Sequence, residues 1–416
     1  MKIGIIVIGD ELLIGQVTDT NSGDIARMIA PAGWQIGEVR TVHDDAEAIR
    51  RVIGEMMGLY DVVLSTGGLG PTKDDITKAT LQGIFGGEMY EDAGVLAHVE
   101  EVFRKRGLKM NSLTRGQAMV PDSCIVIPNA LGTAPVMWFE REGKVLVAMP
   151  GVPFETRHAF ANEVLPRLLD RFADRSVLGH RTLVVVDITE RDLAERLSEW
   201  EDGLQPELHL AYLPQAGYIR LRIDCAGVDN ESVDQALDKA VQWLTDNLGS
   251  HILADEDLTP QQLLMRTLQE HGLSFGSAES CTGGNIAHRM TMLPGVSEVF
   301  MGGVVAYSNE VKMQVLGVDK DVLAENGAVS EPVALQMAQG AQRVLGVDCA
   351  VATSGIAGPG GGSEDKPVGM VCMAFATPEG ALTRTFRFPG NRARIIDRAT
   401  TVALIEMVKA VMEFVK

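Results

Sequence analysis

Short apolar runs alternate with helix-like segments over the first 170 residues, and this alternation limits the fold more than any other feature of the chain. Residues 2–8 form an apolar run, residues 21–30 and 45–57 have helical spacing, and residues 34–42 and 61–65 are typical of strands. Continuous apolar runs are typical of strands buried on both faces of a parallel sheet, and strands that alternate with helices form α/β domains. The first segment is therefore predicted to be an α/β domain.

A glycine-rich loop, residues 66–75, follows one of these strands. Its glycines would let backbone N–H groups approach a phosphate, and its last two residues are acids that precede a predicted helix. Further acids follow the neighbouring strands, whose carboxyl ends lie at one edge of a parallel sheet. Because carboxylates bind hard divalent cations, the pattern favours a metal-bridged phosphate site. The candidate acids are Glu11, Asp19, Asp44, Asp45, Asp74 and Asp75, and the glycines that could cradle a phosphate are Gly67, Gly68 and Gly70.

The acids of this region have a second interpretation, because aspartate and glutamate also cap helices and complement their dipoles. That alternative stays open for Asp45 and Asp75 individually. Capping explains a Gly-Gly-x-Gly loop poorly, so the metal and phosphate site is favoured for the cluster as a whole. Glu155 follows a further apolar strand at residues 144–149 and is an additional candidate, whereas His43 is interpreted as structural.

The middle segment, residues 171–257, shows a β-α-β-β-α-β order of predicted elements. Residues 218–223 alternate between apolar and polar side chains, as expected of a strand with one buried face. An RNA-binding module of similar size is one alternative. The segment is acidic, however, and it has neither an aromatic stacking pair nor a Gly-x-x-Gly clamp. A spacer or dimerisation module is therefore favoured.

Residues 278–284, Ala-Glu-Ser-Cys-Thr-Gly-Gly, lie between a predicted strand at 273–276 and a predicted helix at 285–292. Ser280 is therefore expected at a strand-to-helix corner. The glycines permit close approach to a ligand, and the start of the helix would add partial positive charge for a phosphate or an oxyanion. The alternative is that Ser280 or Thr282 simply caps the helix.

Cys281 is a rival nucleophile, because a thiol at a helix N-terminus can be activated by the helix dipole. It could equally be a small buried apolar side chain, which is the commoner state of a free cysteine. The histidines of this segment, His271 and His288, lie at no strand-to-helix corner. A Ser-His-Asp triad is therefore not expected.

Two more corners and a helix start carry chemistry in the last segment. Tyr307 and Lys312 flank the second corner, where a buried lysine with a lowered pKa could act as general base and a tyrosine could relay the proton. The third corner, residues 354–363, has five glycines within nine residues and is typical of a ligand loop. Arg392 and Arg394 open the terminal helix, where their charge opposes the dipole, so they indicate an anionic ligand or else a solvated basic face.

The composition narrows the classes of function. A length of 416 residues predicts two or three domains. The net charge of -19 disfavours binding to nucleic acid and to anionic lipid. Five scattered cysteines without a CxxC pair favour a reducing compartment and argue against disulfides or a zinc site. No signal peptide or membrane span is evident, so a cytoplasmic protein is expected.

Six motifs together resemble the competence/damage-inducible CinA family over the whole chain, in the order and spacing of that family. They are Gly-Asp-Glu-Leu-Leu-Ile-Gly at 9–15, the loop at 66–75, Pro-Gly-Val-Pro at 150–153, the stretch at 278–284, Tyr-Ser-Asn-Glu-Val-Lys at 307–312 and Thr-Ser-Gly-Ile-Ala-Gly-Pro at 353–359. The resemblance implies a three-layer molybdopterin-binding-like α/β domain at 1–170, a small KH-like α+β domain at 171–257 and an α/β CinA domain at 258–416. One departure, Glu190-Arg191 where the family often has Glu-Ser, affects only local capping.

The resemblance also implies two activities. The C-terminal domain would deamidate nicotinamide mononucleotide without a cofactor, with Ser280 as nucleophile and Lys312 and Tyr307 as its proton-handling partners. The N-terminal domain would be an ADP-ribose pyrophosphatase that needs a divalent metal, with cobalt, magnesium and manganese as candidates. The implied metal ligands are Asp74, Asp75, Glu11 and Asp44, and the implied substrate-binding residues are Gly67, Gly68, Gly70 and Thr72. The implied substrate-binding residues of the C-terminal domain are Glu279, Thr282, Gly283, Ser354, Gly355, Arg392 and Arg394, with Arg394 as the preferred phosphate ligand.

The expected protein is thus a bifunctional enzyme of pyridine-nucleotide salvage. It would act on small-molecule nucleotides as a homodimer, with neither a nucleic acid nor a membrane as partner. The first alternative is a pterin- or nucleotide-binding scaffold that keeps both pockets without turnover. The second is a protein that assists DNA uptake or recombination through protein contacts.

Overall fold

The computed structural model describes residues 1–72, 75–172, 177–227 and 229–416. The chain divides into two compact units. One unit comprises Met1–Gly179 and Cys225–Ala236, and the other comprises His180–Asp224 and Leu237–Lys416. Each unit is described by itself below.

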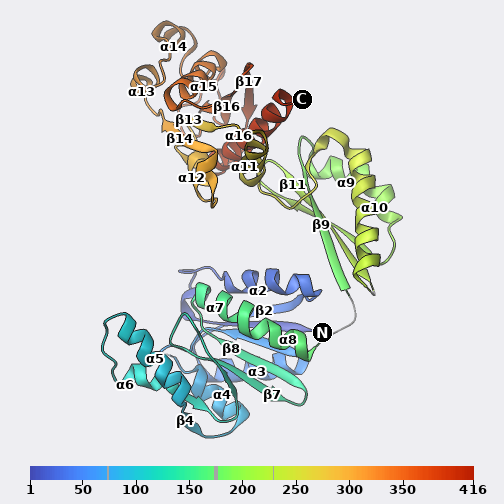
Figure 1. The fold of residues 1–416 in the computed structure, drawn as a ribbon, viewed down its shortest axis with the longest axis vertical. Helices are drawn as coiled ribbons and strands as arrows, with labels where there is room; N and C mark the ends of the chain where they lie inside the picture. Colours follow the sequence, from blue (N-terminus) through green and yellow to red (C-terminus); the bar gives the residue numbers. More distant parts are fainter. Residues whose placement is uncertain (73–74, 173–176, 228) are drawn as a thin grey trace. The chain divides into compact units, whose positions relative to one another are not determined.

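The N-terminal domain is a six-stranded sheet between two layers of helices (Figure 1). Its strands, in spatial order, are β2 (Ile36–Val42), β1 (Ile3–Ile8), β3 (Val62–Thr66), β8 (Lys144–Met149), β7 (Val136–Arg141) and β6 (Ile125–Ile127). The first four run parallel, and the last two are antiparallel to their neighbours. The predicted α/β fold is therefore confirmed for this part of the chain.

Helices cover both faces of this sheet because each buried strand presents apolar side chains to both sides. The helices on one face are α2 (Asn21–Ile29), α7 (Pro153–Ala159) and α8 (Leu165–Arg171), and those on the other are α3 (Ala46–Leu59) and α4 (Thr77–Phe85). Along β1, Ile5 and Val7 join the first core, whereas Ile6 and Ile8 join the second. The remaining short elements are α1 (Asp10–Leu13), β4 (Met89–Glu91), α5 (Ala93–Lys105), α6 (Ser112–Arg115) and β5 (Met119–Pro121).

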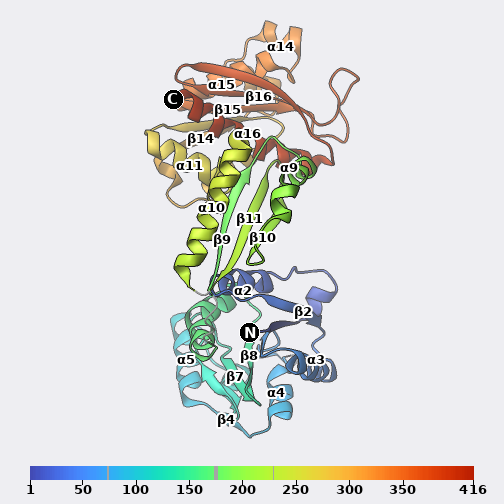
Figure 2. The same cartoon turned by 90° about the vertical axis from the view of Figure 1, so that its right-hand side faces the viewer.

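The middle module has the predicted β-α-β-β-α-β order. Its elements are β9 (Val177–Val185), α9 (Glu190–Asp202), β10 (Leu208–Pro214), β11 (Ile219–Gly227), α10 (Asn230–Leu248) and β12 (Ile252–Ala254). The strands form a sheet in the order β10-β11-β9-β12. Both helices lie along one face of it (Figures 1 and 2), and Trp200 of α9 stacks on Trp243 of α10 with 4.6 Å between ring centroids.

The C-terminal domain is also a sheet with helices on both faces. In spatial order its strands are β14 (Phe300–Val305), β13 (Phe275–Glu279), β15 (Cys349–Gly355), β16 (Met370–Thr377) and β17 (Gly380–Arg387). The first three are parallel, and β16 and β17 are antiparallel. One core contains α11 (Pro260–His271), α12 (Asn285–Thr291) and α16 (Arg392–Phe414), and the other contains α13 (Asn309–Gln314), α14 (Lys320–Asn326) and α15 (Glu331–Leu345).

Two strand ends at the C-terminal corners differ from the sequence-based prediction. The strand predicted at 273–276 is β13 and extends to Glu279, because its residues pair with β14 and β15 on both sides. Ser354 and Gly355 belong to β15 rather than to the glycine-rich loop, since both pair with β16. Among the residues that the structure describes, no helix is long and apolar enough to cross a bilayer.

Candidate functional site

The three predicted corners of the C-terminal domain meet at one pocket of about 180 Å³. They meet there because β14, β13 and β15 are adjacent and parallel, so that Glu279 pairs with Val305 on one side and with Thr353 on the other. This space is the C-terminal pocket, and it is lined by Ser280, Cys281, Tyr307, Asn309, Lys312, Ala328, Val329, Ser354, Gly355, Ala357 and Arg392.

Lys312 lies directly against Ser280. Its Nζ is 3.1 Å from Ser280 Oγ and also donates to the carbonyl of Ala306 at 2.8 Å. Ser308 positions this lysine, because its side chain accepts from Val311 N and caps α13. Lys312 is only 1% exposed, and burial lowers the pKa of its amine. The pair is therefore a serine hydroxyl beside an amine that is more readily neutral than an ordinary lysine.

Cys281 has an environment that suits a nucleophile poorly. The thiol is buried, and burial raises its pKa to about 12. A thiolate is the reactive form of cysteine, so this thiol is protonated and unreactive near neutral pH. Of the two rival side chains in this stretch, the geometry and electrostatics favour Ser280.

The start of α12 does not offer free N–H groups to an anion, so this part of the prediction is wrong. The buried carboxylate of Glu279 accepts hydrogen bonds from Gly284 N, Ile286 N and Ala287 N at 3.0, 3.0 and 2.9 Å. The helix cap is Gly284, which has no side chain, so neither Ser280 nor Thr282 caps the helix. Glu279 neutralises the positive charge at the helix start. It does not line the C-terminal pocket, as a residue that binds the substrate directly would.

Two other predicted substrate-binding residues face a different hollow. Thr282 and Gly283 line a shallow surface depression with His288, not the C-terminal pocket. The Thr282 hydroxyl lies 2.7 Å from the Thr353 hydroxyl. Gly283 has a φ of 63°, a left-handed conformation that glycine adopts without strain and that the tight corner requires.

The two candidate arginines lie in different environments. Arg392 lines the C-terminal pocket, where it donates to Gly358 O at 2.8 Å and to the Tyr307 hydroxyl at 3.2 Å. Arg394 is not among the residues that line the pocket, although both arginines are exposed. Ser354 also lines the C-terminal pocket, and its hydroxyl donates to Ala328 O at 2.6 Å. Of the two arginines, only Arg392 lines the described pocket.

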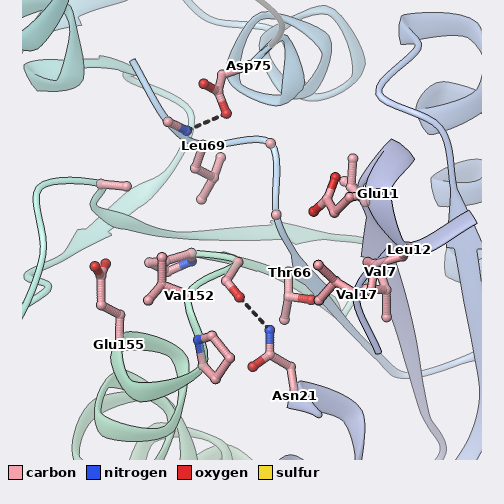
Figure 3. A pocket seen from close by; sticks show the side chains of 18 of the residues that line it. Val7, Glu11, Leu12, Val17, Asn21, Thr66, Leu69, Asp75, Val152 and Glu155 are labelled. Atoms are coloured by element: carbon pink, nitrogen blue, oxygen red, sulfur yellow. Dashed lines mark hydrogen bonds between the residues drawn. The ribbon is translucent and has the colours of Figure 1, made fainter. Parts of the chain in front are cut away.

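A second and larger pocket of about 550 Å³ lies at the carboxyl ends of the N-terminal parallel strands (Figure 3). This N-terminal pocket is lined by every implied metal ligand and substrate-binding residue of the region that the structure describes, namely Glu11, Asp44, Gly67, Gly68, Gly70, Thr72 and Asp75. The fourth predicted metal ligand, Asp74, lies outside the described residues. Figure 3 shows Glu11 and Glu155 on opposite sides of the pocket.

Asp75 holds the glycine-rich loop in shape. Its carboxylate accepts from Gly70 N at 2.7 Å, and from Thr72 N and Thr72 Oγ1 at 2.8 and 2.5 Å. A Cβ on Gly70 would lie 2.5 Å from the Asp75 carboxylate, so the close approach requires glycine at this position. Asp75 therefore fixes the conformation of the loop residues Gly70 and Thr72. The sequence pattern did not reveal this structural role.

The N-terminal pocket is strongly electronegative. Five carboxylates line it, and its described lining residues include no lysine or arginine; the acids are Glu11, Asp19, Asp44, Asp75 and Glu155. Burial raises the pKa of Asp44, and the charges of Asp10, Glu11 and Asp75 raise it further. A phosphate could enter such a pocket only with a cation.

The donor set was predicted to hold a divalent metal, and its chemistry fits one. Oxygen ligands suit hard cations, and Mg²⁺ is often held by one or two carboxylates together with substrate phosphates. Among the described residues, no group of three His, Cys, Asp or Glu side chains could hold a metal alone. The residues present therefore fit a cation that enters with a phosphate ligand rather than a cage built entirely by the protein.

Two buried polar atoms at this pocket also indicate a ligand. Asn21 Nδ2 donates to Gly151 O at 2.8 Å (Figure 3), but Asn21 Oδ1 is buried without a partner in the described part of the chain. Thr66 Oγ1 is likewise buried and has no hydrogen-bond partner among the described residues. Buried polar atoms are rarely left unpaired in native proteins, so a ligand group or water is expected to meet them. Sequence reasoning singled out neither residue: Asn21 belongs to no acidic or glycine-rich motif, and Thr66 opens the glycine-rich loop but is not among its predicted phosphate-binding residues.

Three family profiles match successive parts of the chain. Residues 4–170 match the profile described as "Probable molybdopterin binding domain". Residues 180–254 match "Damage-inducible protein CinA KH domain", and residues 258–411 match "CinA C-terminal domain".

Similar proteins extend over the full chain. A "CinA-like protein" of Flavobacterium psychrophilum is 39% identical over 418 residues and covers 99% of both chains. A "CinA-like protein" of Gemmatimonas aurantiaca is 40% identical and covers 99% of this chain and 96% of its own. Among solved structures, the "competence/damage inducible protein CihA from Agrobacterium tumefaciens" is 40% identical, with a TM-score of 0.36, and covers 38% of this chain and 99% of its own.

Proposed function

The chain belongs to the CinA family, and from this membership and the Ser280–Lys312 contact we propose that its C-terminal domain is an amidase that acts on nicotinamide mononucleotide. The products would be nicotinate mononucleotide and ammonia. The observation that carries the proposal is the buried hydrogen bond of 3.1 Å between the serine hydroxyl and a lysine amine whose pKa is lowered by burial. Such a pair can generate an alkoxide without histidine.

In the proposed reaction, Lys312 Nζ takes the proton of Ser280 Oγ while that oxygen bonds to the carboxamide carbon. The carbonyl electron pair moves onto oxygen, and Lys312 then returns the proton to the amide nitrogen, so that ammonia leaves. A nicotinoyl ester remains on Ser280. A water molecule then gives a proton to Lys312 as its oxygen bonds to the ester carbon. The bond from that carbon to Ser280 Oγ breaks, Lys312 returns the proton to Ser280 Oγ, and nicotinate mononucleotide leaves.

Arg392 is the proposed phosphate ligand of this reaction. Its side chain lines the C-terminal pocket, and two of its nitrogens donate to Gly358 O and to the Tyr307 hydroxyl. A guanidinium binds phosphate through paired N–H groups, and Tyr307 beside it could donate to the same anion or relay a proton. The C-terminal pocket thus combines a nucleophile, a base and an anion-binding group.

For the N-terminal domain we propose divalent-metal-dependent cleavage of ADP-ribose to AMP and ribose 5-phosphate. Glu11, Asp44 and Asp75 are the described candidates, of which one or two would hold the cation together with the substrate phosphates, and cobalt, magnesium and manganese are the candidate metals. A bound divalent cation would neutralise phosphate charge and polarise the scissile bond. For the pyrophosphate, the glycine-rich loop would contribute backbone N–H groups other than those of Gly67, Gly70 and Thr72, which already donate to Met149 O and to the Asp75 carboxylate.

The test is an assay of the full-length protein on both substrates, with and without a chelator. Ammonia release from nicotinamide mononucleotide should proceed in the presence of the chelator, whereas AMP formation from ADP-ribose should require added metal. Absence of both reactions at saturating substrate would contradict the enzyme proposal and would favour a nucleotide-binding scaffold. We also propose that the protein is a homodimer located in the cytoplasm, and light scattering of the purified chain tests the oligomeric state.

A further inference from the structure

We propose that Thr353 is a positioning residue that keeps Ser280 within reach of Lys312. The inference rests on the proposed amidase function, since it assigns a role within the same site. Thr353 is not among the residues that line the C-terminal pocket, so it would act through the nucleophile corner and not by touching the substrate.

Thr353 contacts two residues of that corner. Its backbone carbonyl accepts from Ser280 N at 2.9 Å. Its hydroxyl lies 2.7 Å from the hydroxyl of Thr282. One residue of β15 therefore contacts the nucleophile through its backbone and Thr282 through its side chain.

Burial makes these contacts consequential. Thr353 is 0% exposed and Thr282 is 3% exposed, so water cannot replace a lost partner without rearrangement of the corner. Removal of one hydroxyl of the pair would leave the other buried and unpaired, which is costly in a protein interior. The corner would then shift to satisfy the remaining hydroxyl, and Ser280 would shift with it.

The backbone after the nucleophile gives little resistance to such a shift. Gly283 and Gly284 both have left-handed φ values, 63° and 96°, and glycine adopts many other conformations at little cost. By contrast, Thr353 belongs to a strand with partners on both sides, pairing with Glu279 of β13 and Met373 of β16. The rigid strand thus restrains the flexible corner through the threonine side chain.

The test compares Thr353→Val, which keeps the β-branched shape but removes the hydroxyl, with Thr353→Ser, which keeps the hydroxyl. For ammonia release from nicotinamide mononucleotide, Thr353→Val should lower kcat by about 10- to 100-fold, because small misplacement of a reacting group has effects of that size. KM should stay within about twofold, since binding groups are untouched. Thr353→Ser should restore kcat to within about threefold of the unmodified protein.

A matched control separates positioning from general loss of a buried hydroxyl. Thr267 of α11 is 5% exposed in the same domain, and its hydroxyl donates to Leu263 O at 2.8 Å. Thr267→Val should leave kcat unchanged. If Thr353→Val does not fold, Thr282→Val removes the other hydroxyl of the pair and should lower kcat similarly. Unchanged kcat in the folded valine variant would overturn the proposal.

Crystal structures of the full-length variants give a readout that does not depend on the substrate. Ser280 Oγ and Lys312 Nζ should remain within hydrogen-bond distance in Thr353→Ser and separate beyond it in Thr353→Val. Retention of the contact in Thr353→Val would refute the positioning role even if kcat fell. If the unmodified protein released no ammonia, the amidase proposal would fail, while the two crystal structures would still decide whether Thr353 positions Ser280.

Discussion

Lys312 Nζ lies 3.1 Å from Ser280 Oγ, although 32 residues separate the two in the chain. The contact follows from the adjacency of two parallel strands, since β13 ends just before Ser280 and β14 ends shortly before Lys312. Each strand delivers one reactive group to the same edge of the sheet. The first two predictions concern this pair.

Ser280→Ala should abolish ammonia release from nicotinamide mononucleotide. Loss of a nucleophile that forms the covalent intermediate typically lowers kcat by about a thousandfold or more. Cys281→Ala should keep near-normal kcat, because the buried thiol has its pKa raised to about 12 and is protonated in the assay. Steady-state kinetics of both variants decide the matter. An active Ser280→Ala protein beside an inactive Cys281→Ala protein would assign the nucleophile to the cysteine.

The amidase rate should fall as the pH is lowered through the pKa of Lys312. The base must be neutral to accept the serine proton, and burial places this pKa below the ordinary lysine value of 10.5. Protonation therefore removes activity on the acidic side, and kcat/KM should rise with pH until the amine is neutral. Lys312→Arg should lose activity at every pH, since a guanidinium remains charged. Lys320→Arg, a change at an exposed lysine at the start of α14, should leave the pH profile unaltered.

Local signals in the sequence predicted much of the fold and the positions of the corners. Thr259 with Pro260 begins α11, Ser308 caps α13 and Asn391 caps α16, and in each case the polar residue precedes a helical pattern. Cap preferences arise from contacts within four residues, so sequence alone can reveal them. The corners meet because β14, β13 and β15 are parallel neighbours, and the carboxyl ends of parallel strands lie at one edge of a sheet.

Contacts that extend beyond the four residues of a helix cap could not be predicted in this way. Glu279 was expected to bind substrate, but its carboxylate accepts from the first N–H groups of α12 and is buried. Ala328 and Val329 line the C-terminal pocket because of tertiary packing and carry no chemical signature in the sequence. Arg392 and Arg394 are two residues apart on a helix, and residues with that spacing point to different sides.

The next prediction separates these two arginines. Arg392→Ala should raise KM for nicotinamide mononucleotide by about 10- to 100-fold, because a charged hydrogen-bonding group is worth about 1.5–3 kcal/mol. Arg394→Ala should change KM little, since that side chain does not line the C-terminal pocket. Nicotinamide riboside, which lacks the phosphate, is the control substrate. Arg392→Ala should raise KM for nicotinamide riboside only slightly. An equal rise in KM for both substrates would exclude phosphate binding by Arg392.

The last prediction concerns Asp75 and the N-terminal reaction. Asp75→Asn weakens a proposed cation ligand and replaces an acceptor of the Gly70 and Thr72 N–H groups, so AMP formation from ADP-ribose should fall by about 100-fold or more. Thr72→Val removes only the hydroxyl bond to that carboxylate and should cost about tenfold or less. Asp45→Asn is the matched control, since Asp45 caps α3 by accepting from Glu47 N and Ala48 N and does not line the pocket. It should retain full activity, and all three variants should release ammonia normally. Chelation should stop AMP formation in the unmodified protein, and activity that survives both chelation and Asp75→Asn would eliminate the proposed metal site.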